Sequence, residues 1–155
     1  MLKKLIPLLC VLAFTLPLFA AEVPAEEELE EMTLEALLAF NTDVQKGDFT
    51  DFQATMAKKA QEQLSMEKLN ASFHEFVENK INFASIKNLE PDFETTEIDK
   101  DGILIVKGTY PTTPVILQFR LRFLQEEGEW KLFGINVDTK QDSPDAPQAQ
   151  KKEVD

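Results

Sequence analysis

The chain has 155 residues, with 16 basic side chains against 28 acidic ones and a formal net charge of −12 at pH 7. This length suits a single domain. The acidic excess argues against nucleic acid and anionic membrane surfaces as partners, because both require a basic protein face. A well-solvated surface is the simplest explanation for the charge.

The first 21 residues have the pattern of a secretory signal peptide. Lys3 and Lys4 form a positive start, and residues 5–19 are apolar and carry no charge. That stretch is shorter than the roughly 20 residues that a membrane-spanning helix needs. Small residues follow, which predicts cleavage after Ala20 or the alanine next to it, with a second candidate site at residues 23–25. We therefore expect an exported protein, periplasmic or secreted, from a bacterial source.

Two alternatives to cleavage are disfavoured. An uncleaved anchor fits poorly with the two prolines inside the apolar stretch. Lipid attachment would need a small residue before the only cysteine, Cys10, but Leu9 stands there. After cleavage we expect no stable membrane insertion, no disulfide and no thiol chemistry. Loss of Lys3 and Lys4 leaves 14 of the 16 basic residues against all 28 acidic ones, a net charge of −14.

Three helices are predicted after an acidic N-terminal segment at residues 22–32. The first carries one apolar stripe at three- and four-residue steps, made of Leu29, Met32, Ala36, Leu37, Phe40 and Val44. Gly47 is expected to end it, and Asp48 to cap the second helix. The apolar side of that second helix is Phe49, Phe52, Met56, Ala60 and Leu64. Ser65 is expected to cap the third helix, with a stripe of Leu69, Phe73, Phe76 and Val77 that fades over residues 79–82.

Four strands are predicted after residue 83, where the period of the apolar residues changes to two. They are expected at residues 94–98, 103–110, 115–124 and 130–137, with turns at 99–102 and 126–129. Phe133, Ile135 and Val137 are expected on one face of the last strand. Residues 139–155 are rich in Pro, Gln, Asp and Lys, which predicts a disordered tail.

This order predicts an α+β fold in which three N-terminal helices pack on a four-stranded antiparallel sheet, because the helices carry apolar stripes that match the apolar sheet face. The domain is expected to span residues 33–138. Two segments resemble the nuclear transport factor 2-like superfamily, which has a cone-shaped, two-layer fold, and the resemblance implies that the sheet is curved. They are residues 40–49, similar to the family's helix, Gly-Asp turn and helix opening, and residues 128–135, similar to its closing strand with Gly-x-Trp-Lys-Leu.

The resemblance implies a pocket between the sheet and the helices, but it implies no activity, because members include isomerases, dehydratases, transport factors and exported binding domains. Isomerase-type members place acidic and tyrosyl groups in this pocket. Here Tyr110 is the only tyrosine, and no position of the chain matches a family catalytic Asp. We therefore assign no catalytic residue.

No metal site or cofactor is predicted. His74 is the only histidine, and Glu78 four residues later is best interpreted as its helical partner on the surface. Residues 97–102 imitate the opening of a calcium loop, but position 12 of that loop is Gly108 and a strand follows instead of a helix. A solvated hairpin turn is the better interpretation.

Four residues are candidates for ligand binding: Tyr110, Arg120, Arg122 and Trp130. Arg binds carboxylates through two hydrogen bonds, and Tyr and Trp stack on apolar ligands. The alternative places both arginines on an outer solvent face and Trp130 in the core. The leading hypothesis is a non-enzymatic exported domain that binds a small ligand or a partner protein. Its alternatives are an enzyme with a buried carboxylate as general base, and a homodimer formed through the exposed sheet face.

Overall fold

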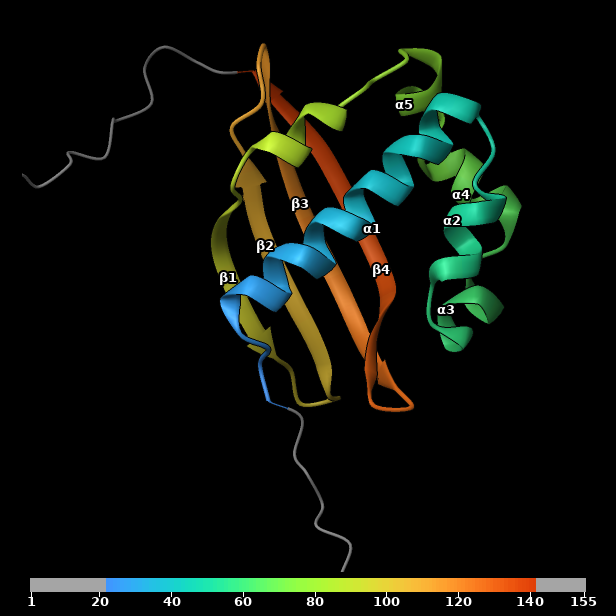
Figure 1. The fold of residues 1–155 in the computed structure, drawn as a ribbon. Helices are drawn as coiled ribbons and strands as arrows, with labels where there is room; N and C mark the ends of the chain where they lie inside the picture. Colours follow the sequence, from blue (N-terminus) through green and yellow to red (C-terminus); the bar gives the residue numbers. More distant parts are fainter. Residues whose placement is uncertain (1–21, 142–155) are drawn as a thin grey trace, which may run out of the picture.

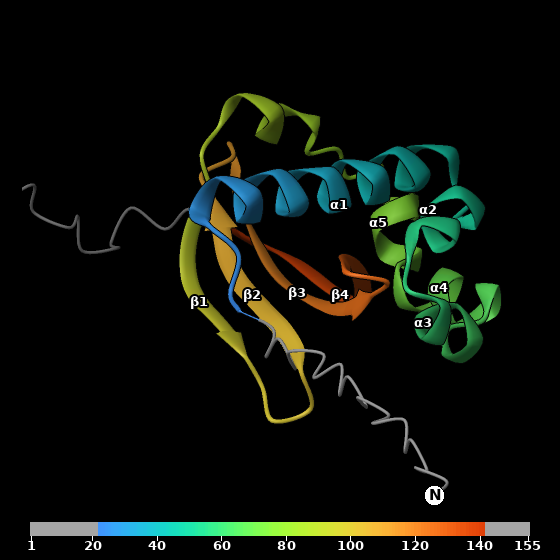
Figure 2. The same ribbon diagram turned by 60° about the horizontal axis from the view of Figure 1, so that its bottom comes forward.

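The computed structural model describes residues 22–141, so the predicted leader and the part of the predicted tail from residue 142 onward lie outside the described residues. The fold is α+β, with helices followed by one antiparallel sheet in the order β1-β2-β3-β4. Figure 1 shows α1 crossing one face of this sheet, with α2–α5 gathered beyond its β4 side. Turned by 60°, the same ribbon shows the sheet bending around α1 (Figure 2).

The longest helix, α1 (Glu26–Lys46), forms because its apolar residues recur on one side and three glutamates occupy its first turn, where they complement the helix dipole. Leu29, Leu37, Phe40 and Val44 of the predicted stripe are buried. Gly47 ends the helix as predicted, in the left-handed region with φ of 72°, which glycine adopts without steric cost.

The second and third predicted helical regions are each divided in two. The first gives α2 (Thr50–Thr55) and α3 (Lys58–Gln63), and the second gives α4 (Met66–Ser72) and α5 (His74–Glu78). The break after α2 has a tertiary cause: Met56 is extended, and the amide of Ala57 donates to the carbonyl of Leu132 in the sheet at 2.8 Å. Ser65 caps α4 as predicted, its hydroxyl accepting from the amide of Lys68.

The described strands are β1 (Asp92–Ile98), β2 (Ile103–Tyr110), β3 (Val115–Glu126) and β4 (Glu129–Gln141), and a short 3-10 helix, η1 (Ala84–Asn88), precedes them. The hairpin turn after β1 is held by Asp99, whose carboxylate accepts from the amides of Asp101 and Ile103 at 2.9 Å. β4 extends to Gln141, which pairs with Val115. Residues 139–141 therefore belong to the sheet, in contrast to the predicted tail.

The prediction that Phe133 shares a face of β4 with Ile135 and Val137 is wrong for Phe133. Between the pairs Arg122–Gly134 and Phe123–Leu132 the register shifts, and Phe133 is the extra residue of a β-bulge. A bulge reverses the alternation, so the Phe133 ring lies 5.3 Å from the guanidinium carbon of Arg122 on the outer face of the sheet. Val137, by contrast, is buried opposite Phe119 on the inner face.

The core lies between α1 and the inner face of the sheet, and it is rich in phenylalanine. Phe40 of α1 is its centre on the helical side, with five aromatic rings whose centroids lie 4.6–6.1 Å away: Phe49, Phe52, Phe73, Phe76 and Phe83. The buried residues of β2 and β3 supply the sheet side: Leu104, Val106, Tyr110, Leu117, Phe119, Leu121 and Phe123. Edge-to-face and offset ring contacts of this kind stabilise beyond the area that they bury.

Candidate functional site

A cavity of about 460 Å³ opens between α1, the α2–α3 region and the hairpin that joins β3 to β4. We call it the main pocket. Its lining residues are Met32, Glu35, Ala36, Ala39, Ala54, Thr55, Met56, Lys58, Gln61, Phe123, Glu126, Trp130, Lys131 and Leu132. The volume falls in the range of small-molecule sites, about 300–1,000 Å³.

The pocket exists because small side chains of α1 face a break in the helical layer. Ala36 and Ala39 lie on the side of α1 next to the buried stripe and leave room that larger residues would fill. The extended backbone at Met56 separates α2 from α3 and turns α3 toward β4. Met56, Phe123 and Leu132 are buried and give the pocket an apolar floor.

Charged side chains surround this apolar floor. Glu126 of β3 is half-buried, and its Oε2 accepts from the backbone amide of Lys58 at 3.1 Å, which places a carboxylate at the start of α3. The ammonium group of Lys131 lies 2.6 Å from the carboxylate of Glu129. This hydrogen bond, with the charge of Glu129 and those of Glu35 and Glu126, raises the pKa of Lys131, whereas desolvation opposes the rise.

The four predicted ligand-binding residues do not come together. Trp130 is half-buried and lines the main pocket. Tyr110 is buried on the inner face of β2, 5.7 Å between ring centroids from Phe119. Its burial, with a smaller contribution from the charge of Glu30, raises its pKa to about 12.

Arg120 and Arg122 lie exposed on the outer face of the sheet, as the alternative interpretation of these arginines had it. A smaller hollow of about 270 Å³ lies there, lined by Arg120 together with Glu94, Lys107, Gly108, Gln118, Phe119, Asn136 and Asp138. The ammonium group of Lys107 is already paired with Glu94 at 2.6 Å. The sheet therefore separates both arginines from the main pocket.

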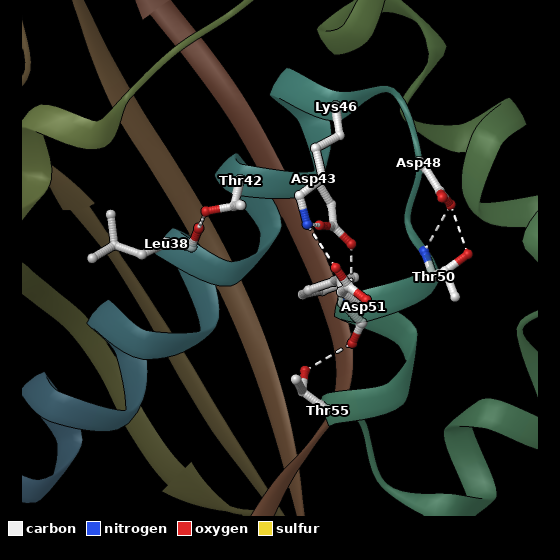
Figure 3. Close-up of polar contacts among 9 residues, drawn as sticks. Leu38, Thr42, Asp43, Lys46, Asp48, Thr50, Asp51 and Thr55 are labelled. Atoms are coloured by element: carbon white, nitrogen blue, oxygen red, sulfur yellow. Dashed lines mark hydrogen bonds and ion pairs between the residues drawn. The ribbon is translucent and has the colours of Figure 1, made fainter.

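The buried carboxylate, Asp43, lies outside both cavities. It is 1% exposed, and its Oδ2 accepts from the backbone amide of Phe52 at 2.7 Å while Oδ1 lies 3.1 Å from the ammonium group of Lys46. Figure 3 shows Lys46 between Asp43 and Asp51 at the junction of α1 and α2. Oδ2 of Asp43 thus holds α2 directly, and Oδ1 acts through Lys46, which also pairs with Asp51 of α2.

Asp48 acts at the same junction, but the N-cap of α2 is Phe49, so the predicted cap residue stands one position too early. Its Oδ1 accepts from the amide of Thr50 at 3.0 Å and from the hydroxyl at 2.7 Å (Figure 3). Both hydrogen bonds lower the pKa of Asp48, and the bond from the Thr50 hydroxyl has the larger effect. The carboxylates of Asp43 and Asp48 therefore stabilise the junction between α1 and α2.

Within residues 22–141, no three His, Cys, Asp or Glu side chains are grouped so that they could hold a metal ion. His74 and Glu78 lie 3.2 Å apart and are both exposed, in the i,i+4 arrangement expected from their spacing. No helix of this part of the chain is long and apolar enough to cross a membrane.

Comparisons with known proteins give no assignment. No family model matches the chain, and no curated protein or solved structure matches it significantly. The sequence did not indicate most of the pocket residues, such as Glu35, Ala39 and Gln61. Only Ala39 carried a signal, as a small residue beside the large apolar residues of the first predicted helix.

Proposed function

We propose that this protein is an exported binding domain that holds a small, mainly apolar ligand in the main pocket. The observation that carries the proposal is the cavity of about 460 Å³, with its buried apolar floor, a tryptophan wall and a charged rim. Binding sites for small molecules combine these three features, since apolar surface supplies affinity and a few polar groups orient the ligand. Export is proposed from the leader pattern in residues 1–21.

Binding is proposed in preference to general-base catalysis because of where the carboxylates lie. A general base is commonly tuned by burial in an apolar site. Asp43 is buried, but both of its oxygens hold the α1–α2 junction, outside the main pocket. In the pocket, Glu35 is exposed and Glu126 is half-buried, with one oxygen at the start of α3.

We also propose a fold relationship with the nuclear transport factor 2-like superfamily. The supporting features are the Gly47-Asp48 turn between α1 and α2, the closing strand that follows Gly128, and a pocket between helices and a bent sheet. An experimental structure with a bound ligand would test both the cone-shaped arrangement and the position of the site.

The binding proposal is tested with N-phenyl-1-naphthylamine, a neutral apolar dye that accepts excitation energy from tryptophan. Trp130 is the only tryptophan, so energy transfer reports a dye held near the main pocket. We expect saturable transfer with the unaltered protein and its loss in Ala39→Phe, which fills the pocket. Ala71→Phe, on an exposed position of α4, is the matched control and should bind as before.

Thermal unfolding of both variants verifies that they remain folded. Absence of saturable transfer in the unaltered protein would contradict the proposal. Equal binding by Ala39→Phe and Ala71→Phe would place the dye elsewhere and would contradict the assignment of the site.

A further inference from the structure

We propose that the main pocket selects ligands that carry a positive charge at one end of an apolar body, an inference that rests on the binding role proposed above. The feature that leads to it is the balance of charge at the pocket mouth. Both signs are present there, but the cations already have partners and the carboxylates have capacity left.

The two lysines of the mouth are each paired with a glutamate of the β3–β4 turn region. The ammonium group of Lys58 lies 3.2 Å from Glu127, and that of Lys131 lies 2.6 Å from Glu129. Neither of these glutamates lines the pocket. An anionic ligand would therefore compete with carboxylates that are held close by on the same hairpin.

The two carboxylates that do line the pocket are not neutralised in this way. Glu35 of α1 makes no ion pair within the described part of the chain, and Glu126 uses only Oε2, toward the amide of Lys58. The negative charges of Glu35 and Glu126 both help to raise the pKa of Lys131. The lining itself holds two carboxylates and two ammonium groups, and the glutamates that pair with these ammonium groups bring the surroundings of the mouth to four carboxylates against two ammonium groups, a net charge of −2.

Trp130 also favours a positively charged ligand. Trp130 lines the pocket together with Glu35 and Glu126, and the face of an indole attracts cations through its quadrupole. An ammonium group near the mouth would meet this face and the two carboxylates, while the apolar body of the ligand would lie on Met56, Phe123 and Leu132. The chain's net charge of −12 favours the approach of the same class of ligand.

The test compares three probes with the same eight-carbon chain: n-octylammonium, octan-1-ol and n-octanoate. Isothermal titration calorimetry at low ionic strength should rank them in that order, with octylammonium bound about fivefold more tightly than octan-1-ol. Glu35→Gln should weaken octylammonium about threefold and leave octan-1-ol unchanged. Glu97→Gln, which removes the same charge from the exposed side of β1, should change neither probe.

The outcomes separate this inference from the binding role. Binding of octan-1-ol and the naphthylamine dye with no preference for octylammonium would overturn charge selection alone. Tighter binding of octanoate, or equal effects of the Glu35 and Glu97 variants, would overturn it as well. If none of the three probes and no dye binds, the binding role fails together with the inference.

Discussion

The carboxylate of Asp43 accepts a hydrogen bond from the backbone amide of Phe52, with 2.7 Å between Oδ2 and N. Asp43 lies in the last turn of α1 and Phe52 in the first turn of α2. An amide in the first turn of a helix has no partner within the helix, and a carboxylate there also complements the helix dipole. Asp43 thus connects two helices that both contribute residues to the lining of the main pocket.

Asp43→Ala should therefore lower the free energy of unfolding by about 2–3 kcal/mol, because it leaves a buried amide without its charged acceptor. Asp43→Asn should cost less, since the amide oxygen still accepts a hydrogen bond. Urea unfolding followed by circular dichroism measures both. Asp51→Ala is the control: Asp51 also pairs with Lys46, but its side chain is 78% exposed, so the loss should stay below about 1 kcal/mol. Equal losses for Asp43→Ala and Asp51→Ala would contradict the structural role of Asp43.

Two buried glycines of the sheet should respond differently to alanine. A Cβ at Gly108 would lie 2.3 Å from the backbone oxygen of Asp92 and 2.9 Å from Cζ of Phe119, so the strands would have to move. We expect Gly108→Ala to destabilise by about 2–3 kcal/mol. A Cβ at Gly134 would meet only the guanidinium end of Arg122, at 2.6 Å.

Because the Arg122 side chain is exposed and flexible, Gly134→Ala should cost less than about 1 kcal/mol. Thermal and urea unfolding of the two variants under identical conditions compares them directly. A larger loss for Gly134→Ala than for Gly108→Ala would show that the register of the sheet differs from the one described.

Tyr110 should make stability fall at alkaline pH. Burial raises its pKa from 10.0 to about 12. The folded state therefore favours the protonated phenol. The resulting stabilisation is complete at pH values below the pKa of the phenol in the unfolded chain, and it is lost as pH rises through the pKa of the phenol in the folded protein. Two pH units correspond to about 2–3 kcal/mol, so the free energy of unfolding should decline between pH 10 and 12.

Urea unfolding across this pH range, with Tyr110→Phe as the comparison, measures the effect. The variant lacks the titrating hydroxyl, so its decline between pH 10 and 12 should be shallower than that of the unaltered protein. Identical slopes for both would argue against a buried, neutral phenol. Because Tyr110 is the only tyrosine, ultraviolet absorbance of the phenolate follows the same titration independently.

Glu126 should contribute to stability through α3, whereas its neighbour should not. Glu126→Ala removes the acceptor for the amide of Lys58 and should cost about 1 kcal/mol. Glu127→Ala breaks an ion pair whose side chains are 78% and 85% exposed, and it should change stability by less than about 0.5 kcal/mol. Chemical unfolding of the two variants compares them, and an equal effect would refute the capping role of Glu126.

The strands and turns were predictable because their signals are local. Alternation of apolar and polar residues along β3 reflects a sheet with one buried face, and the glycines at positions 47, 102 and 128 all have positive φ. The same local reasoning failed at Phe133, since a β-bulge depends on how two strands pair and leaves no mark in the alternation of one strand. It also failed to predict the break in the helix at Met56, because this break depends on the hydrogen bond from the amide of Ala57 to the carbonyl of Leu132 in the sheet.

The candidate site was less predictable than the fold. Trp130 was selected from its residue type and does line the main pocket, but Tyr110, Arg120 and Arg122 were selected in the same way and lie elsewhere. Which face of a strand meets a cavity depends on packing across the sheet. The residue types alone therefore could not separate a pocket wall from a core or an outer face.

By itself, the sequence determined the acidic charge, the order of helices and strands, and the apolar stripes that make α1 cover the sheet, because each depends on composition or on spacing along one segment. Only the tertiary structure decided where Glu35, Glu126 and Trp130 meet. They come from α1, β3 and β4, and their proximity depends on the pairing of β3 with β4 and on the packing of α1 across the sheet (Figure 1).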